Sequence, residues 1–188
     1  VNCTYPGASA KVVAETVAQA RTASRQAVVV YEELPAVLTV EDAMKTGSTH
    51  LPPRTLSRGD AKSEVAASSY RLSGRIVSGA QEHFYLETQI TLAAPKEGGD
   101  VTLFCSTQDP SSVQALVARV LARPANAVSV EVRRLGGGFG GKETAATHFA
   151  AIAALAAVKT GRACKLRLDR DDDMRITGKR HEFFSDFS

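Results

Sequence analysis

Residues 136–141 hold five glycines and one phenylalanine, and this short run constrains the fold more than any other part of the sequence. Glycine loses more conformational freedom on folding than other residues, so five together require a backbone that turns sharply or approaches another group closely. Before the run, Val128, Val130 and Val132 alternate with polar residues, which predicts a half-buried strand. After it, an alanine-rich run up to Val158 predicts a helix. A loop between a strand and a helix start presents free N–H groups that favour an anionic ligand.

Two nucleotide-binding patterns overlap the glycine run. Residues 136–141 fit the dinucleotide pattern GxGxxG, but the acidic residue expected about 20 positions later is missing, and the next candidate is Asp169. The run followed by Lys142 also fits a phosphate-binding P-loop, except that Glu143 stands where a Ser or Thr should hold magnesium. A nucleotide-binding module that uses residues 136–141 for phosphate therefore remains an alternative function, although a carboxylate at this position would repel phosphate.

Composition limits the partners. The 188 residues carry a net charge of only +3, and the basic residues are dispersed, which disfavours nucleic acid. Cys3, Cys105 and Cys164 form no CxxC pair, so we expect buried thiols rather than a zinc site or an iron–sulfur cluster. The longest apolar run, residues 149–158, is too short to cross a bilayer, and we expect a cytoplasmic protein with no membrane partner. The first residue, Val1, and the strand-like last residues lead us to expect a piece of a longer chain.

The N-terminal part predicts a small βαβ-like piece. Thr16 and Gln19 have the spacing of a capping box at a helix start, and Val28–Val30 have strand preference. Between residues 41 and 60 a short helical segment alternates with glycine and proline, which predicts a crossing between two subdomains.

The remainder predicts a mixed sheet with helices. Residues 70–78, 86–94 and 101–107 are strand candidates, and the turn-forming sequence APKEGGD joins the last two as an antiparallel pair. Asp109 is placed to cap a helix whose first residue is Pro110. The predicted fold class is α+β, with the small βαβ-like piece followed by a mixed sheet-and-helix part.

Five separated motifs, in matching order and spacing, resemble the molybdenum-binding subunit of the xanthine dehydrogenase family of molybdenum hydroxylases. They are YEELPAV at 31–37, QEHFYLE at 81–87, STQ at 106–108, GGGFGGKE at 136–143 and LDRDDDMRITGKRH at 168–181. The resemblance implies that residues 1–50 end a hammerhead-like α/β domain and that residues 51–188 begin the molybdenum cofactor-binding domain.

The resemblance also implies an activity and its cofactors. Enzymes of this family hold molybdenum through molybdopterin and hydroxylate purines, converting hypoxanthine and xanthine to urate with oxygen from water. Electrons then leave through two [2Fe-2S] clusters to FAD and NAD, and these groups lie in other domains or subunits. The expected partners are a purine substrate, the remainder of the molybdenum subunit, and the FAD and Fe–S parts of an oligomeric enzyme of purine catabolism.

Site residues carry over position by position. The resemblance implies that Gln108 donates a hydrogen bond towards the oxo ligand of molybdenum, and that the backbone amides of Phe139 and Gly140 lie near the metal ligands and the pterin. Gln108 and Phe139 are thus the residues next to the metal, in a site without cysteine or histidine ligands. Glu143 binds the purine, whereas aldehyde oxidases have an apolar residue there, and the Phe139 ring lines the substrate channel. For these two residues a helix-dipole role and a core role remain alternatives.

Some features depart from the family or have a simpler explanation. Gly79 is followed by Ala80 where the family has a second glycine, and Ala145 replaces an arginine. The family's catalytic glutamate lies beyond Ser188, so no catalytic residue is expected in this sequence, and the chain alone should be inactive.

Four polar features are expected to be structural. His83 and Glu87 are expected to be satisfied polar groups, and Lys142 should bind backbone or a carboxylate rather than phosphate. The acidic run 169–173 should be a solvated, salt-bridged segment because arginines interleave with it.

Overall fold

The computed structural model describes the backbone of residues 2–5 and 8–188 and the side chains from residue 12 onwards. The chain divides into two compact units. The first unit consists of residues 1–29 and 82–179, and the second of residues 30–81 and 180–188. Helices and mixed sheets together confirm the predicted α+β class.

The first unit is built around a four-stranded sheet with the order β6-β5-β4-β7. Its strands are β4 (Ile90–Pro95), β5 (Val101–Cys105), β6 (Val128–Glu131) and β7 (Cys164–Arg167). The central strand β4 is antiparallel to both β5 and β7, with Thr91 opposite Cys105 and Leu166, whereas β5 and β6 run parallel. The predicted antiparallel pair on either side of APKEGGD is confirmed, and a short 3-10 turn, η1 (Glu97–Gly99), joins its strands.

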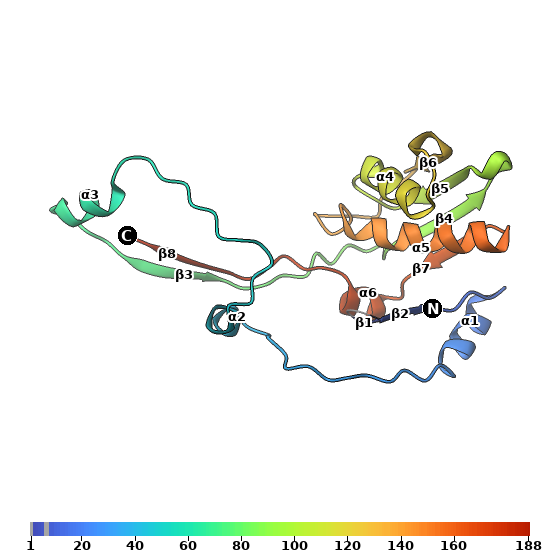
Figure 1. Cartoon of the computed structure of the whole chain (residues 1–188), viewed down its shortest axis with the longest axis horizontal. Helices are drawn as coiled ribbons and strands as arrows, with labels where there is room; N and C mark the ends of the chain where they lie inside the picture. The colour runs from blue at the N-terminus through green and yellow to red at the C-terminus, as the bar shows by residue number, and fades with distance from the viewer. Residues whose placement is uncertain (1, 6–7) are drawn as a thin grey trace. The chain divides into compact units, whose positions relative to one another are not determined.

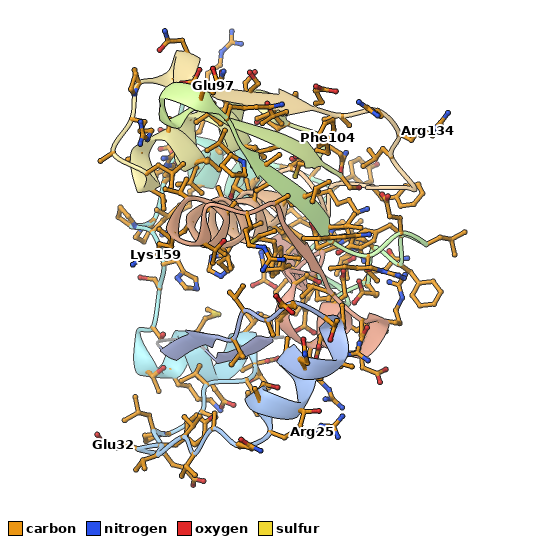
Figure 2. All side chains as sticks on the ribbon, turned by 90° about the vertical axis from the view of Figure 1, so that its right-hand side faces the viewer. Arg25, Glu32, Glu97, Phe104, Arg134 and Lys159 are labelled. Carbon is orange, nitrogen blue, oxygen red and sulfur yellow. The ribbon has the colours of Figure 1, made fainter. Side chains whose placement is uncertain are left out.

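Two helices cover one face of this sheet, α4 (Pro110–Val120) and α5 (Ala145–Thr160) (Figure 1). The alternate side chains of β5 that face them, Val101, Leu103 and Cys105, are buried. Small alanines on α5 let this helix pack closely on the strands, and Val113 and Val117 of α4 complete the core. Figure 2 shows Glu97 at the β4–β5 turn and Lys159 near the end of α5 on the outside of this layer.

Local sequence explains where these helices begin. Asp109 accepts a hydrogen bond from the backbone N–H of Ser112, and Pro110 is the first residue of α4, as predicted. Thr16 and Gln19 form the predicted capping box at the start of α1 (Val17–Ser24). At 16 residues α5 is the longest of the described helices, and none of these could span a bilayer.

The predicted strand at Val28–Val30 is wrong. These residues lie in an irregular segment after α1, and the side chains of Val28 and Val30 are exposed. Strand preference forms a strand only where a neighbour pairs with its N–H and C=O groups, and no described strand lies beside this segment. Instead, β1 (Asn2–Tyr5) and β2 (Ala8–Lys11) form an antiparallel pair before α1.

The second unit has little regular structure. One antiparallel pair, β3 (Gly74–Ser78) with β8 (Phe183–Phe187), is its only sheet, and the bidentate ion pair of Arg75 with Asp186 bridges the two strands at 2.6 and 2.9 Å. Its helices are α2 (Val40–Thr46) and α3 (Ala61–Ala67). The helix predicted within residues 41–60 is confirmed as α2. The division into residues 1–50 and 51–188 stays a prediction.

Candidate functional site

The glycine run forms the loop between β6 and α5, as the sequence predicted. Gly137 and Gly140 have φ angles of 92° and 89°, in the left-handed region that glycine adopts without strain. Phe139, between them, also has a positive φ of 53°, which is unfavourable for a residue with a bulky side chain. The loop therefore holds one aromatic residue in a strained backbone conformation, with glycines on both sides.

The other three glycines allow the loop to approach its own protein. A Cβ atom on Gly136 would lie 2.4 Å from the Cβ of Glu87, and one on Gly138 would lie 2.4 Å from Oε1 of Gln108. A Cβ atom on Gly141 would lie 2.6 Å from the Tyr85 ring. A side chain at any of these positions would displace the group that it meets, so much of the glycine requirement comes from packing against the protein rather than from an approach to a ligand.

Gln108 is fixed in one orientation by the loop. Its Oε1 accepts hydrogen bonds from the backbone N–H groups of Gly140 at 3.0 Å and Lys142 at 3.2 Å. Its own backbone N–H donates to the carbonyl oxygen of Lys142 at 2.9 Å. With the side-chain oxygen held by two donors, the NH₂ group of Gln108 faces away from the loop, where this residue is exposed. Gln108 therefore presents a neutral hydrogen-bond donor to whatever binds there.

Lys142 is turned into the protein and is completely buried. Its Nζ donates to Oε2 of Glu87 at 2.9 Å and to Oγ of Ser106 at 2.8 Å, and it lies 4.8 Å from the centre of the Tyr85 ring. The prediction that Lys142 binds a carboxylate is confirmed. A P-loop lysine must reach phosphate on the open side of the loop, and this side chain points the other way.

Glu87 joins the start and the end of the loop. One oxygen, Oε2, accepts from the backbone N–H of Gly136 at 3.0 Å, from Lys142, and from the hydroxyl of Ser106. Partial burial alone would raise the pKa of the Glu87 carboxyl, but the hydrogen bonds from Ser106, Gly136 and Lys142 outweigh it and hold this pKa below its usual value. Glu87 is therefore ionised at neutral pH, and the prediction that it is a satisfied polar group is confirmed.

A second buried network lies beneath the loop. The hydroxyl of Tyr85 donates to Oδ1 of Asp173 at 2.6 Å, and the backbone N–H of Gln89 donates to Oδ2 of Asp173 at 2.7 Å. The Gln89 side chain then donates to the carbonyl oxygen of Gly141 at 3.0 Å. Burial and the hydrogen bond to Asp173 raise the pKa of Tyr85 to about 12. The network connects α6 (Arg170–Ile176) to the loop.

The expectation that residues 169–173 are a solvated acidic run is wrong for Asp173. Asp173 is buried because residues from 170 onwards form a helix whose inward face carries its carboxylate to the hydroxyl of Tyr85 and the backbone N–H of Gln89. Asp169, at the start of this run, is ion-paired with Arg21 as predicted. His83 also differs from expectation, because its Nδ1 is buried without a hydrogen-bond partner among the described residues.

The structure brings Gln108 and Gly140 into contact and leaves Phe139 and Glu143 exposed in the same segment. The Gly140 N–H donates to Gln108. Phe139 comes one residue before Gly140 in the chain, and Glu143 comes three residues after it. The Phe139 side chain is 74% exposed, so a core role for it is excluded in this structure. Glu143 is exposed and forms no hydrogen bond or ion pair with the described residues.

Neutral donors at this surface fit an anionic, oxygen-rich cofactor. The Gln108 NH₂ group is directed outwards, and the backbone N–H of Phe139 has no partner within the described part of the chain. The N–H of Gly140, which the resemblance also assigned to the cofactor, is occupied by Gln108. Among the side chains from residue 12 onwards, no three His, Cys, Asp or Glu residues are grouped to hold a metal ion.

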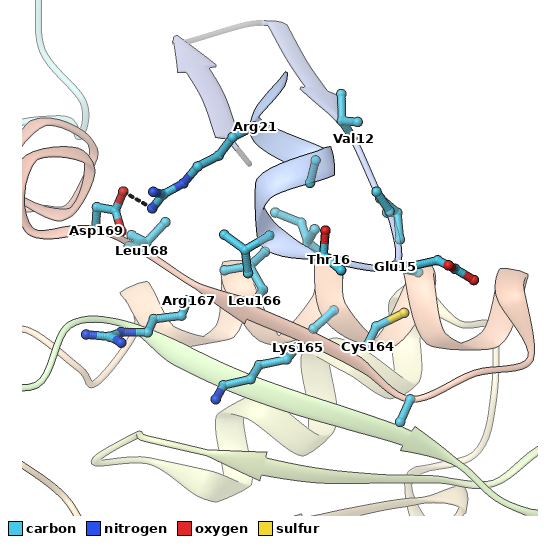
Figure 3. A pocket seen from close by; sticks show the side chains of 18 of the residues that line it. Val12, Glu15, Thr16, Arg21, Cys164, Lys165, Leu166, Arg167, Leu168 and Asp169 are labelled. Atoms are coloured by element: carbon cyan, nitrogen blue, oxygen red, sulfur yellow. Dashed lines mark hydrogen bonds and ion pairs between the residues drawn. The ribbon is translucent and has the colours of Figure 1, made fainter. Parts of the chain in front are cut away.

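A pocket of about 450 Å³ lies elsewhere, between α1 and the α5–β7 segment (Figure 3). Figure 3 shows Thr16 and Glu15 on one side and Cys164 and Lys165 on the other. None of the predicted site residues lines it. The pocket and the glycine loop are thus separate features of the first unit.

Comparison with known proteins identifies the family. The sequence model of the molybdopterin cofactor-binding domain matches residues 42–188. The chain belongs to this family. Over 177 residues it is 46% identical to xanthine dehydrogenase/oxidase of Mus musculus, and over 178 residues it is 44% identical to aldehyde oxidase 2 of Cavia porcellus. Each match covers 94% of this chain but only 13% of the relative, so the chain spans about an eighth of the length of these proteins.

Solved structures of molybdenum hydroxylases share the fold. Aldehyde oxidoreductase from Desulfovibrio gigas superposes with a TM-score of 0.77 at 24% identity, over 90% of this chain and 19% of that one. Quinoline 2-oxidoreductase from Pseudomonas putida 86 gives a TM-score of 0.70 at 28% identity, over 85% of this chain and 21% of that one. The chain is thus a segment of a molybdopterin cofactor-binding domain, and it has the fold of the corresponding part of these two solved structures.

Two clusters that matter for the loop were not identified as such from the sequence. The joint contact of Glu87 and Lys142 brings together residues 55 positions apart, and the buried Tyr85–Asp173 pair joins residues 88 apart. The resemblance marked three of the motifs that contain them, QEHFYLE, GGGFGGKE and LDRDDDMRITGKRH, without saying that these segments touch. The single tyrosine and the carboxylates within these motifs were the available signal.

Proposed function

We propose that this chain forms one wall of the active site of a xanthine dehydrogenase-type molybdenum hydroxylase that acts on purines. The observation that carries the proposal is the fixed orientation of Gln108. Two loop N–H groups hold its oxygen, and its NH₂ group has no hydrogen-bond partner among the described residues, so this donor remains available in a segment where Phe139 and Glu143 are also exposed.

The residues of this wall have distinct tasks. Gln108 and the free N–H of Phe139 would hold the molybdenum cofactor, whose bound metal supplies the oxidising centre for hydroxylation with oxygen from water. An amide suits this task because it donates a hydrogen bond without titrating. The exposed Phe139 ring would line the channel, where it excludes water and stacks against a planar substrate.

Glu143 supports a purine substrate over an aldehyde. The resemblance implies an acidic residue here in xanthine-type enzymes and an apolar one in aldehyde oxidases, and this chain has the acid. In this structure the carboxylate has no partner within the described residues and stands at the open side of the loop, available to accept a hydrogen bond from a ring N–H. A simple aldehyde offers no such donor, so the carboxylate would favour purine.

The remaining chemistry is assigned to other parts of the enzyme. A general base must lie within hydrogen-bond reach of the reacting oxygen, and the family's glutamate has no counterpart in these residues. The partners would be the remainder of the molybdenum subunit together with the [2Fe-2S], FAD and NAD sites, in a cytoplasmic oligomer.

Glu143→Gln and Glu143→Val in the full-length enzyme test the substrate assignment. Loss of a charged acceptor should lower kcat/KM for xanthine by about tenfold or more, while kcat/KM for an aromatic aldehyde changes by less than about twofold. Glu97→Gln, at an exposed turn, is the matched control and should alter neither. Equal losses for both substrates, or unchanged xanthine kinetics, would contradict the purine assignment.

The nucleotide-binding alternative makes an opposite prediction. It requires Lys142 to bind phosphate, but Lys142 is buried against Glu87 and Ser106. Calorimetric titration of the 188-residue chain with ATP and magnesium should therefore show no binding.

Elemental analysis of the same purified chain should find no stoichiometric molybdenum, and an assay of xanthine-dependent dye reduction should find no turnover, because the chain supplies only one side of the cofactor site. Tight ATP binding would favour the alternative, and bound molybdenum would show that this chain suffices for the cofactor.

A further inference from the structure

We propose that Lys142 is a positioning residue, whose buried ammonium holds the glycine loop so that Gln108 faces the cofactor and Glu143 faces the substrate. This inference rests on the proposed function of those two residues. Lys142 itself is completely buried and cannot touch either ligand in this structure.

The side chain of Lys142 ties the end of the loop to two other segments. Its Nζ binds Glu87 at 2.9 Å and Ser106 at 2.8 Å, so it reaches both the QEHFYLE and the STQ segments. The Tyr85 ring, 4.8 Å away, faces the same ammonium. A buried charge is costly unless it is paired and hydrogen-bonded, and these three contacts meet that requirement. Any movement of the loop end away from this cluster would leave the charge unpaired.

The backbone of the same residue fixes Gln108. The Lys142 N–H donates to Oε1 of Gln108, and the Lys142 carbonyl accepts from the backbone N–H of Gln108 and from the hydroxyl of Thr107 at 3.0 Å. If the Gln108 amide flipped, its NH₂ group would face two N–H donors and both hydrogen bonds to Oε1 would be lost. The inward side chain of Lys142 thus determines which end of the Gln108 amide is presented to the cofactor.

The start of the loop is held by the same cluster. Oε2 of Glu87 accepts from the N–H of Gly136 at 3.0 Å as well as from Lys142, so one carboxylate binds both ends of the segment from 136 to 142. With Lys142 directed inwards, the next residue, Glu143, is exposed on the open side. The Lys142–Glu87 pair therefore closes the loop and sets the direction of the carboxylate proposed for substrate.

Hydrogen exchange on the ¹⁵N-labelled 188-residue chain tests the loop-holding role without any activity. In Lys142→Met, the amides of Gly140 and of position 142 should exchange about fivefold faster or more, the factor that corresponds to one lost hydrogen bond. Amides of the β5 and α5 core, such as Leu103 and Ala150, should keep their rates within about twofold. Lys159→Met, at an exposed position on α5, is the matched control and should change neither set.

Two outcomes of the exchange measurement would overturn the proposal. Uniform acceleration of loop and core amides would show that Lys142 acts only on global stability, and unchanged loop amides would show that it holds nothing. If Lys142→Met does not fold, Glu87→Gln replaces it, because it removes the charge from the partner but keeps an acceptor oxygen. The same local pattern, with a smaller factor, is expected there, while Lys142→Arg should retain most of the protection.

Kinetics of the full-length enzyme complete the test. Lys142→Met should lower kcat for xanthine by about tenfold or more at unchanged molybdenum content, and Lys142→Arg should restore part of it. Local loss of protection with unchanged turnover would overturn the positioning role. Failure of Glu143→Gln to affect xanthine kinetics would instead count against the proposed function, and the exchange measurement would still decide whether Lys142 holds the loop.

Discussion

Both units of the chain contain large apolar side chains, but the units bury them to different extents. In the first unit, the sheet and the helices α4 and α5 enclose a continuous core, and polar groups such as Lys142 and Asp173 are buried with partners. In the second unit no described residue is buried, although Leu56, Tyr70 and Leu72 are large apolar side chains. Its order depends on one strand pair and two short helices.

The difference shows what an apolar residue needs in order to contribute to stability. Burial of apolar area provides the main favourable free energy of folding, and an exposed leucine provides little of it. Helices of seven residues are marginal without tertiary contacts, which applies to α2 and α3. The second unit therefore gains little free energy of folding from burial of its own apolar side chains.

Matched leucine truncations give the largest expected contrast. Leu103 is 0% exposed in β5, and Leu72 of the second unit is 77% exposed. Leu103→Ala should lower the free energy of unfolding by about 3 kcal/mol because it leaves a cavity in the core. Leu72→Ala should change it by less than about 0.5 kcal/mol. Urea unfolding followed by circular dichroism measures both, and similar losses would show that Leu72 belongs to a core that forms in solution.

A smaller loss is expected from the buried carboxylate. Asn in place of Asp173 offers one acceptor oxygen to the two donors that bind the carboxylate, so the Tyr85 hydroxyl or the backbone N–H of Gln89 would lose its partner. The hydroxyl of Thr177 keeps the backbone carbonyl oxygen of residue 173 as its acceptor. Asp173→Asn should therefore lower the free energy of unfolding by about 2 kcal/mol. The exposed Asp171→Asn on the same helix should have almost no effect. The same urea titration measures this pair, and a neutral Asp173→Asn would show that the network adds nothing to the first unit.

The smallest effect concerns pH. The pKa of Glu87 in the folded chain lies below its usual value of 4.5, so its contribution to stability is complete above that pH and is lost as the pH falls through the folded value. The stability difference between the unaltered chain and Glu87→Gln should therefore be largest near neutral pH and shrink on acidification. Urea midpoints measured across this pH range provide the check. A difference that stays constant would mean that Glu87 titrates normally in the folded state.

The sequence predicted elements whose signals are local. The Asp109–Pro110 helix start, the Thr16 capping box and the antiparallel pair on either side of residues 94–100 depend on neighbouring residues, and all three are confirmed. The strand expected at Val28–Val30 failed because strand formation depends on a distant partner rather than on the segment itself.

The sequence predicted the segments that form the site but not the contacts between them. The motifs indicated which segments carry it, and the structure brings Gln108 to Gly140. The burial of Asp173 could not be predicted, because the acidic run looks solvated until a helix directs one carboxylate inwards. The close contacts that require several of the glycines could not be predicted either, because the groups they contact, such as Glu87 and Tyr85, lie about 50 residues earlier in the chain.

The glycine loop leaves very little freedom for variation. Of the eight positions from 136 to 143, three glycines are closed to any side chain by contact, two by their positive φ, and Lys142 by burial. Phe139 and Glu143 carry the exposed side chains of this segment, and at Phe139 the positive φ still disfavours β-branched replacements. We therefore expect substitutions in a mutant library of this loop to be tolerated best at positions 139 and 143, where a new substrate range can arise while the architecture stays the same.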